Sequence, residues 1–188
     1  GLYRLLSRTL DATPYASRLV SAEPIVAALR GRKTASEIAL IKRAIERTED
    51  AIDALDEVIR PGMTDLEVAE FLHTFLEENG YGSSWEWDYC PVVTVGPEST
   101  FGHGMPSGLK TERGNLVHID FGISREGFVS DLQRTWYLAE HGEVEAPPDV
   151  AAAWDAVTAA LEAGRAALKP GAKGWEVDAA ARETLIAS

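Results

Sequence analysis

The chain of 188 residues has little cysteine and no long apolar run, and each shortage excludes a class of protein. Cys90 is the single cysteine, so the chain holds no internal disulfide, and a reducing cytoplasm is the simplest compartment for it. No apolar stretch approaches the length of a transmembrane helix, and the N-terminus lacks the apolar core of a signal peptide. We therefore expect a cytoplasmic protein that has no membrane partner.

Positive charge is also scarce. Lys and Arg number 18 against 30 Asp and Glu, which gives a formal net charge of -12. This balance argues against nucleic acid or an anionic membrane as a partner, whereas an acidic surface can gather divalent cations. The Gly-x-Ser-x-Gly and phosphate-loop patterns are absent. The apolar content of 45% is that of an ordinary globular protein with a real core.

Two pairs of helices are expected, each joined at a Pro-Gly corner. Capping boxes at 34–37 and 64–67 predict helices that run to about residue 60 and about residue 79. A second pair is predicted over 149–168 and 175–186. Its corner, Pro170-Gly171, lies 109 positions after Pro61-Gly62, and Glu176 repeats Glu67 at the same offset. We interpret this echo as an internal duplication, although a single echo can also arise by chance. A true repeat predicts that both helix pairs pack on the same face of one sheet and leave the face of the aspartates open.

The duplication predicts that the chain is part of a larger domain. The first copy continues into a strand over 89–95, a loop over 96–113 and a hairpin, whereas the second copy stops after its two helices. The chain is then an α+β fragment of a two-copy domain. Residues 1–33, with a short helix over 23–29, are interpreted as a connection or the tail of a preceding N-terminal domain. Residues 34–188 form the N-terminal part of the larger domain.

The stretch from Leu116 to Leu138 predicts a β-hairpin. A turn at Arg125-Glu126 pairs Ser124 with Gly127 and places Asp120 directly opposite Asp131, so that both carboxylates share one face. A three-residue loop would shift this register by one residue. Arg134 would lie on the other face and would need an acidic partner from a helix. That other face is expected to pack on the core through Val117, Ile119, Phe121, Ile123, Phe128 and Leu132.

Two carboxylates held side by side repel each other, so the pair favours a shared proton or a bound cation. A hairpin whose polar face is only solvated is the alternative. The Asp-Thr/Ser-Gly turn of aspartic proteases is absent. His118 shares the carboxylate face, as a hydrogen-bonding neighbour or a surface residue. His103, between two glycines, is either an accessible ligand-binding residue or an exposed loop histidine.

Three further residues allow two interpretations each. Cys90 fits a small core residue better than a nucleophile. Trp85 and Trp87 alternate along the chain, so they either line one face of a pocket or cover the core.

Five segments resemble the pita-bread metallopeptidases, most closely Xaa-Pro dipeptidase (prolidase) and Xaa-Pro aminopeptidase. Methionine aminopeptidase and creatinase share that fold. The resemblance covers about residues 30–188, and its strength lies in the order of the five segments. They are Lys33-Thr-Ala-Ser-Glu-Ile38, Arg60-Pro-Gly-Met-Thr-Asp-Leu-Glu67, His103-Gly-Met-Pro-Ser107, Gly114-Asn-Leu-Val-His-Ile-Asp-Phe-Gly122 and Gly127-Phe-Val-Ser-Asp-Leu-Gln-Arg-Thr135.

The resemblance implies the pita-bread fold, here its first half plus the opening helices of the second, pseudo-symmetric half. It also implies two divalent metal ions, Mn before Co or Zn. Asp120 and Asp131 would be metal ligands, Asp131 bridging the two ions, and His103 would bind the substrate. The remaining His and two Glu ligands would lie beyond Ser188, so the fragment alone is expected to be inactive.

The implied reaction is hydrolysis of the peptide bond before a proline at the second position, catalysed by a metallo-exopeptidase. The resemblance also implies a possible homodimer. Water activated by the two cations would attack the scissile carbonyl. Two alternatives stay open: a metal-independent hydrolase like creatinase, and a non-catalytic binding module with the pita-bread shape. Retention of both aspartates argues against the creatinase-like alternative.

Overall fold

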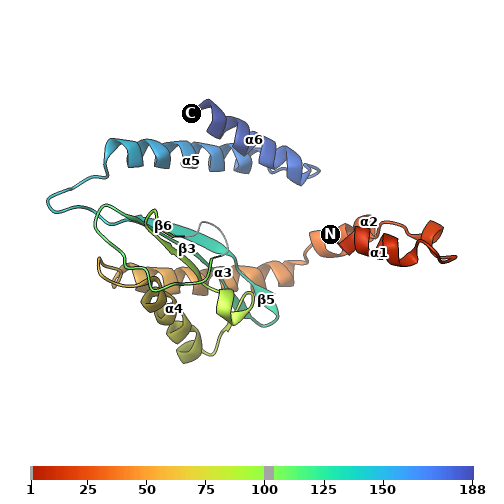
Figure 1. Ribbon diagram of the computed structural model, residues 1–188, viewed down its shortest axis with the longest axis horizontal. Helices are drawn as coiled ribbons and strands as arrows, with labels where there is room; N and C mark the ends of the chain where they lie inside the picture. Colours follow the sequence, from red (N-terminus) through yellow and green to blue (C-terminus); the bar gives the residue numbers. More distant parts are fainter. Residues whose placement is uncertain (1, 100–103) are drawn as a thin grey trace.

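The computed structural model describes residues 2–99 and 104–188 (Figure 1). Its centre is a three-stranded antiparallel sheet in the order β2-β3-β6. These strands are β2 (Val92–Val95), β3 (Leu116–Phe121) and β6 (Leu132–Tyr137). A smaller sheet has the order β1-β4-β5, formed by β1 (Gly82–Ser83), β4 (Ile123–Arg125) and β5 (Phe128–Val129).

Helices α3 (Ala35–Asp56) and α4 (Asp65–Asn79) cover one face of the central sheet. Both begin with the predicted capping boxes. The Thr34 amide donates to Glu37 Oε2 at 2.6 Å, and the Thr64 amide donates to Glu67 Oε2 at 2.7 Å. In return, each threonine hydroxyl accepts a hydrogen bond from the glutamate amide. The sequence signal for both helix starts is therefore confirmed.

Helix α3 ends at Asp56, four residues before the predicted end. The carbonyl of Arg60 accepts a hydrogen bond from the Thr111 hydroxyl at 2.9 Å. The chain just before Pro61 is therefore bonded to the segment between β2 and β3 and does not continue the helix. A residue that precedes proline also avoids helical backbone angles. The strand predicted over 89–95 likewise begins only at Val92, after the short 3-10 helix η2 (Trp87–Tyr89).

The predicted core face of the hairpin is confirmed on β3 and β4, and Leu132 of β6 packs partly buried against the same core, whereas Phe128 of β5 is only half-buried and is not one of the core residues. Val117, Ile119, Phe121 and Ile123 have no solvent exposure, whereas His118 and Asp120 between them are half-buried. The helices contribute Leu55, Val68, Leu72 and Leu76 to the same core. Burying such side chains contributes roughly 1.5–3 kcal/mol each, so this face holds the sheet against α3 and α4.

The predicted hairpin register is wrong by two residues. The structure pairs Arg125 with Phe128 across a turn of Glu126 and Gly127, and Asp120 lies opposite Gln133 instead of Asp131. Both turn residues have positive φ, 52° and 81°. A two-residue turn of this kind needs positive φ at both positions, and glycine adopts it without strain. The turn therefore consists of Glu126 and Gly127, one residue later than the predicted turn of Arg125 and Glu126. A shift of two keeps each side chain on its predicted face.

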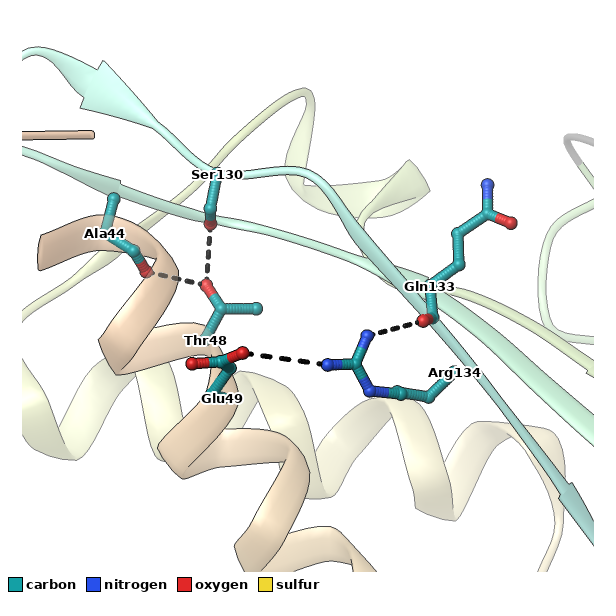
Figure 2. Close-up of polar contacts among 6 residues, drawn as sticks. All are labelled: Ala44, Thr48, Glu49, Ser130, Gln133 and Arg134. Carbon is teal, nitrogen blue, oxygen red and sulfur yellow. Dashed lines mark hydrogen bonds and ion pairs between the residues drawn. The ribbon is translucent and has the colours of Figure 1, made fainter. Parts of the chain in front are cut away.

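Arg134 lies on the helix-facing side of β6, as expected, and has the expected kind of partner. Its guanidinium lies 3.8 Å from Glu49 of α3 and also donates to the Gln133 carbonyl at 2.8 Å (Figure 2). Both charged side chains are about half exposed, so the ion pair orients the arginine more than it stabilises the fold.

Helices α5 (Pro148–Ala167) and α6 (Gly174–Ala187) form a hairpin that packs closely at small residues. A Cβ placed on Gly164 would lie 3.5 Å from that of Ala181. The corner before α6 repeats the corner before α4. Gly62 and Gly171 have φ of 97° and 93°, and the Lys173 amide donates to Glu176 at 2.7 Å, as Thr64 does to Glu67. Superposition of the whole helix pairs stays a prediction.

The position of the second pair differs from the expectation that both pairs cover one face. Figure 1 shows α5 and α6 across the sheet from α3 and α4. A groove of about 600 Å³ separates α5 from the carboxylate face, which contributes Leu116, Thr135 and Tyr137 to its lining. The chain leaves the edge strand β6 toward this side, and α5 then packs mainly on α6.

The N-terminal segment contains α1 (Leu2–Leu10), which the sequence did not predict, the 3-10 helix η1 (Ala16–Arg18), and α2 (Glu23–Gly31), which it did. None of the three has a buried residue, and they extend away from the sheet (Figure 1). The division at residue 33 stays a prediction. Within the described ranges, no helix combines the length and apolarity needed to cross a bilayer.

Candidate metal centre

Strands β3 and β6 present a polar face on the side of the sheet opposite α3 and α4. Asp120 lies in the middle of this face, between Val92 on β2 and Gln133 on β6. One of its carboxylate oxygens, Oδ1, is fully buried. Next to it, His118 Nε2 lies 3.2 Å from Gln133 Oε1, so Gln133 holds the imidazole on the same face.

Asp131 immediately precedes β6 and is exposed. Its predecessor Ser130 is buried against α3, and successive residues of an extended chain point to opposite faces (Figure 2). The carboxylate of Asp131 therefore belongs on the face of Asp120 and Gln133. In the observed register Asp131 is the diagonal neighbour of Asp120, a relationship that separates residues by roughly 7–8 Å in antiparallel sheets.

Ser130 fixes the backbone between the two aspartates. Its hydroxyl lies 2.6 Å from that of Thr48 on α3 and accepts a hydrogen bond from the Ile123 amide at 2.8 Å. Its carbonyl accepts from the Ser84 hydroxyl at 2.7 Å. The hairpin is thus tied to α3 and to the 84–85 segment at the point where it passes from the central sheet to the small one. Such buried hydrogen bonds rigidify a backbone because leaving them unmade is costly.

Gly122 is required at the same crossing. A Cβ at this position would overlap the Ser130 carbonyl oxygen and would also press on the Ser84 hydroxyl. The Gly122 carbonyl accepts from the Ser84 amide at 3.1 Å, so the strand turns away from its neighbour here. The two aspartates therefore lie on either side of a backbone crossing that only glycine fits.

The donor set fits part of a divalent metal site. Carboxylate oxygens on adjacent strands are rigid ligands of the type that Mn²⁺, Mg²⁺ and Zn²⁺ accept. Across residues 2–99 and 104–188, no three His, Cys, Asp or Glu side chains gather closely enough to hold a metal ion together. The pair can contribute two ligands and needs others to close the site.

The remaining candidates fall outside this centre. His103 lies outside the described residues. Cys90 is fully buried, and burial raises the pKa of its thiol, which confirms a core residue rather than a nucleophile. Trp85 packs on the core, whereas Trp87 is 38% exposed and stacks on His73 with ring centroids 4.1 Å apart. His73, to which the sequence assigned no role, also contacts the Cys90 carbonyl through Nε2 at 2.7 Å.

Sequence reasoning missed Ser130, Thr48 and Ser84, which hold the centre in place. Thr48 gave a signal, because it occupies a buried position in the apolar stripe of α3 and a buried hydroxyl needs a partner. Nothing local in the sequence identified that partner, which lies 82 positions away.

Comparison with known proteins agrees with this fold. The uncharacterized peptidase YqhT of Bacillus subtilis is 29% identical over 171 residues, covering 91% of this chain and 46% of its own length. A putative Xaa-Pro aminopeptidase of Mycoplasma pneumoniae is 32% identical over 160 residues, covering 85% and 44%. The structure of Xaa-Pro dipeptidase from Bacillus anthracis superposes with a TM-score of 0.76 at 31% identity, covering 89% of this chain and 44% of that one.

These similarities show that the protein has the pita-bread fold of the prolidases and X-Pro aminopeptidases. The profile of metallopeptidase family M24 matches residues 39–188, and the chain belongs to that family. Metal dependence is general to this family, which accords with the position of Asp120 on the polar face of the sheet. The chain spans about half the length of the curated relatives that it matches.

Proposed function

We propose that the whole protein is a metal-dependent exopeptidase that hydrolyses the bond before a proline at the second position of a peptide. The carrying observation is Asp120 opposite Gln133 on the polar face of the sheet, with Asp131 two residues before Gln133, in a chain of family M24. The preference for Xaa-Pro is supported by relatives named Xaa-Pro aminopeptidase and Xaa-Pro dipeptidase.

In this proposal Asp120 and Asp131 would be ligands of two divalent cations, Asp131 as a ligand of both, and further ligands would complete the site. When bound, such cations supply Lewis acidity and lower the pKa of water. Gln133 orients His118 beside the carboxylates, and the crossing at Ser130 keeps Asp131 at a fixed place relative to Asp120. His103 would donate a hydrogen bond to the peptide. Mn is the favoured ion, before Co or Zn.

The test compares Asp131→Asn with the unchanged whole protein. We expect the variant to lose turnover of an Xaa-Pro dipeptide with added Mn and to lose bound metal, measured by elemental analysis, while its circular dichroism is retained. Asp178→Asn is the matched control, because Asp178 is an exposed carboxylate on α6 that pairs with Arg182. Near-normal turnover in Asp131→Asn would remove Asp131 from the ligand set.

The alternatives make different predictions in the same assay. A non-catalytic binding module would show no turnover in the unchanged protein, and a creatinase-like hydrolase would keep its activity after metal is removed. The cytoplasmic location and a homodimer remain proposals too, the first from composition and the second from the family resemblance.

A further inference from the structure

A buried carboxylate outside the metal centre, that of Asp65, accepts hydrogen bonds from the loop between β2 and β3. Asp65, the first residue of α4, is only 2% exposed. Its Oδ2 accepts hydrogen bonds from the Ser107 amide at 2.7 Å and the Ser107 hydroxyl at 3.2 Å. Its Oδ1 accepts from the Gly108 amide at 2.7 Å and from the Leu66 amide at 2.8 Å. The carboxylate is therefore directed mainly at the loop.

Backbone hydrogen bonds continue the same attachment along the corner before α4. The Asp65 amide donates to the Leu109 carbonyl at 2.9 Å, the Thr111 amide to Met63 at 2.7 Å, and the Gly62 amide to Thr111 at 2.8 Å. These bonds hold residues 109–111 like a short strand. The Asp65 carboxylate adds hydrogen bonds to the two preceding residues, Ser107 and Gly108. The backbone changes direction there, since Gly108 has a φ of 85°.

The repeated corner separates this task from helix capping. The first residue of α6, which matches Asp65 in α4, is Gly174. Helix α6 nevertheless has the same glutamate cap, made by Glu176. In α4 that cap is made by Glu67. The corner thus forms without a carboxylate at the position of Asp65, and this side chain serves the loop.

We propose that Asp65 is a positioning residue for the substrate-binding loop. Ser107 lies four residues after His103, to which the proposed function assigns substrate binding. Asp65 thus fixes Ser107 and Gly108, which belong to the loop between β2 and β3, the strands that carry Val92 and Asp120. This step rests on the proposed function, whereas the anchoring itself does not.

The test measures anchoring and catalysis separately in Asp65→Asn of the whole protein. The amide group of asparagine places a donor against a loop amide that is also a donor, so at least one bond is lost. We expect amide hydrogen exchange at Ser107 and Gly108 to rise about tenfold or more, as loss of about 1.4 kcal/mol would give. We expect KM for an Xaa-Pro dipeptide to rise by a similar factor while kcat changes by less than about threefold.

Two further variants keep the result interpretable. Glu67→Gln, in the same helical turn, should leave exchange at Ser107 and Gly108 unchanged. Gly108→Ala should reproduce the KM effect from the loop side, because its positive φ disfavours alanine while the added Cβ meets only Leu66 at 3.8 Å. This variant also serves if Asp65→Asn does not fold.

The outcomes are distinct. Unchanged exchange in Asp65→Asn would overturn the anchoring. Raised exchange with an unchanged KM would overturn the positioning role and leave a purely structural one. If the unchanged protein cleaves no Xaa-Pro peptide, the proposed function fails and takes the substrate role of the loop with it, while the exchange result still decides the anchoring.

Discussion

The hydroxyl of Ser130 lies 2.6 Å from the hydroxyl of Thr48, and this contact joins the hairpin to α3 directly beside Asp131 (Figure 2). Both residues are almost fully buried. The Thr48 hydroxyl also bonds to the Ala44 carbonyl of its own helix at 2.9 Å. A chain of hydrogen bonds therefore runs from the helix backbone to the strand that leads into the candidate metal centre.

The first prediction concerns that chain of bonds. Thr48→Val keeps the shape of the side chain but removes the hydroxyl, so Ser130 loses a buried partner, and the free energy of unfolding should fall by about 1 kcal/mol. The measurement is urea unfolding of the whole protein. Thr184→Val is the matched control, because the Thr184 hydroxyl donates to the carbonyl four residues earlier at 2.9 Å, as the Thr48 hydroxyl does to Ala44. Equal losses in the two variants would contradict a stabilising role for the Ser130 contact.

The second prediction concerns the register of β3 and β6. Leu116 lies opposite Tyr137, so cysteines at these two positions should form a disulfide under mild oxidation, because opposed Cα atoms come within the range that a disulfide spans. Cysteines at Leu116 and Thr135 should not, since diagonal neighbours lie roughly 7–8 Å apart. Mass spectrometry before and after reduction gives the answer. Bridging of the second pair alone would restore the register in which Asp120 opposes Asp131.

The third prediction is a pH dependence. Hydrogen bonds from the Thr64 backbone and hydroxyl lower the pKa of the Glu67 carboxyl from its ordinary value. A carboxylate whose pKa is lower in the folded state stabilises the fold above its unfolded pKa, and that contribution is lost as pH falls through the folded pKa. Glu67→Gln cannot titrate, so its urea midpoint should change less than that of the unchanged protein between about pH 6 and about pH 3. Glu78→Gln, an exposed change on the same helix, should preserve the original dependence. Identical pH profiles for all three proteins would exclude the Glu67 contribution.

Local chemistry in the sequence was sufficient to predict the helix starts and the core face. The capping boxes at Thr34 and Thr64 are signals within four residues, and the alternation from Val117 to Ile123 is a period of two along one strand. Residue order also carried the family resemblance, which the match over residues 39–188 confirms. These features need no knowledge of distant residues.

Three features could not be predicted in the same way. The register depends on which residues of the hairpin turn adopt positive φ. These are Glu126 and Gly127, whereas the sequence pattern predicts a turn at Arg125 and Glu126. The bonds of Ser130 and Asp65 join residues far apart in the chain, and pattern reasoning does not reach such pairs. The position of α5 depended on the path after β6, which no local preference fixes.

Gly122 has a consequence for how this protein can vary over evolutionary time. Every other amino acid brings a Cβ, and a Cβ here would collide with main-chain atoms that cannot be shortened or exchanged. Every substitution at Gly122 should therefore require the backbone to shift, whatever the size of the new side chain. The path of the backbone between Asp120 and Asp131 therefore depends on a position that admits no gradual change in side-chain size.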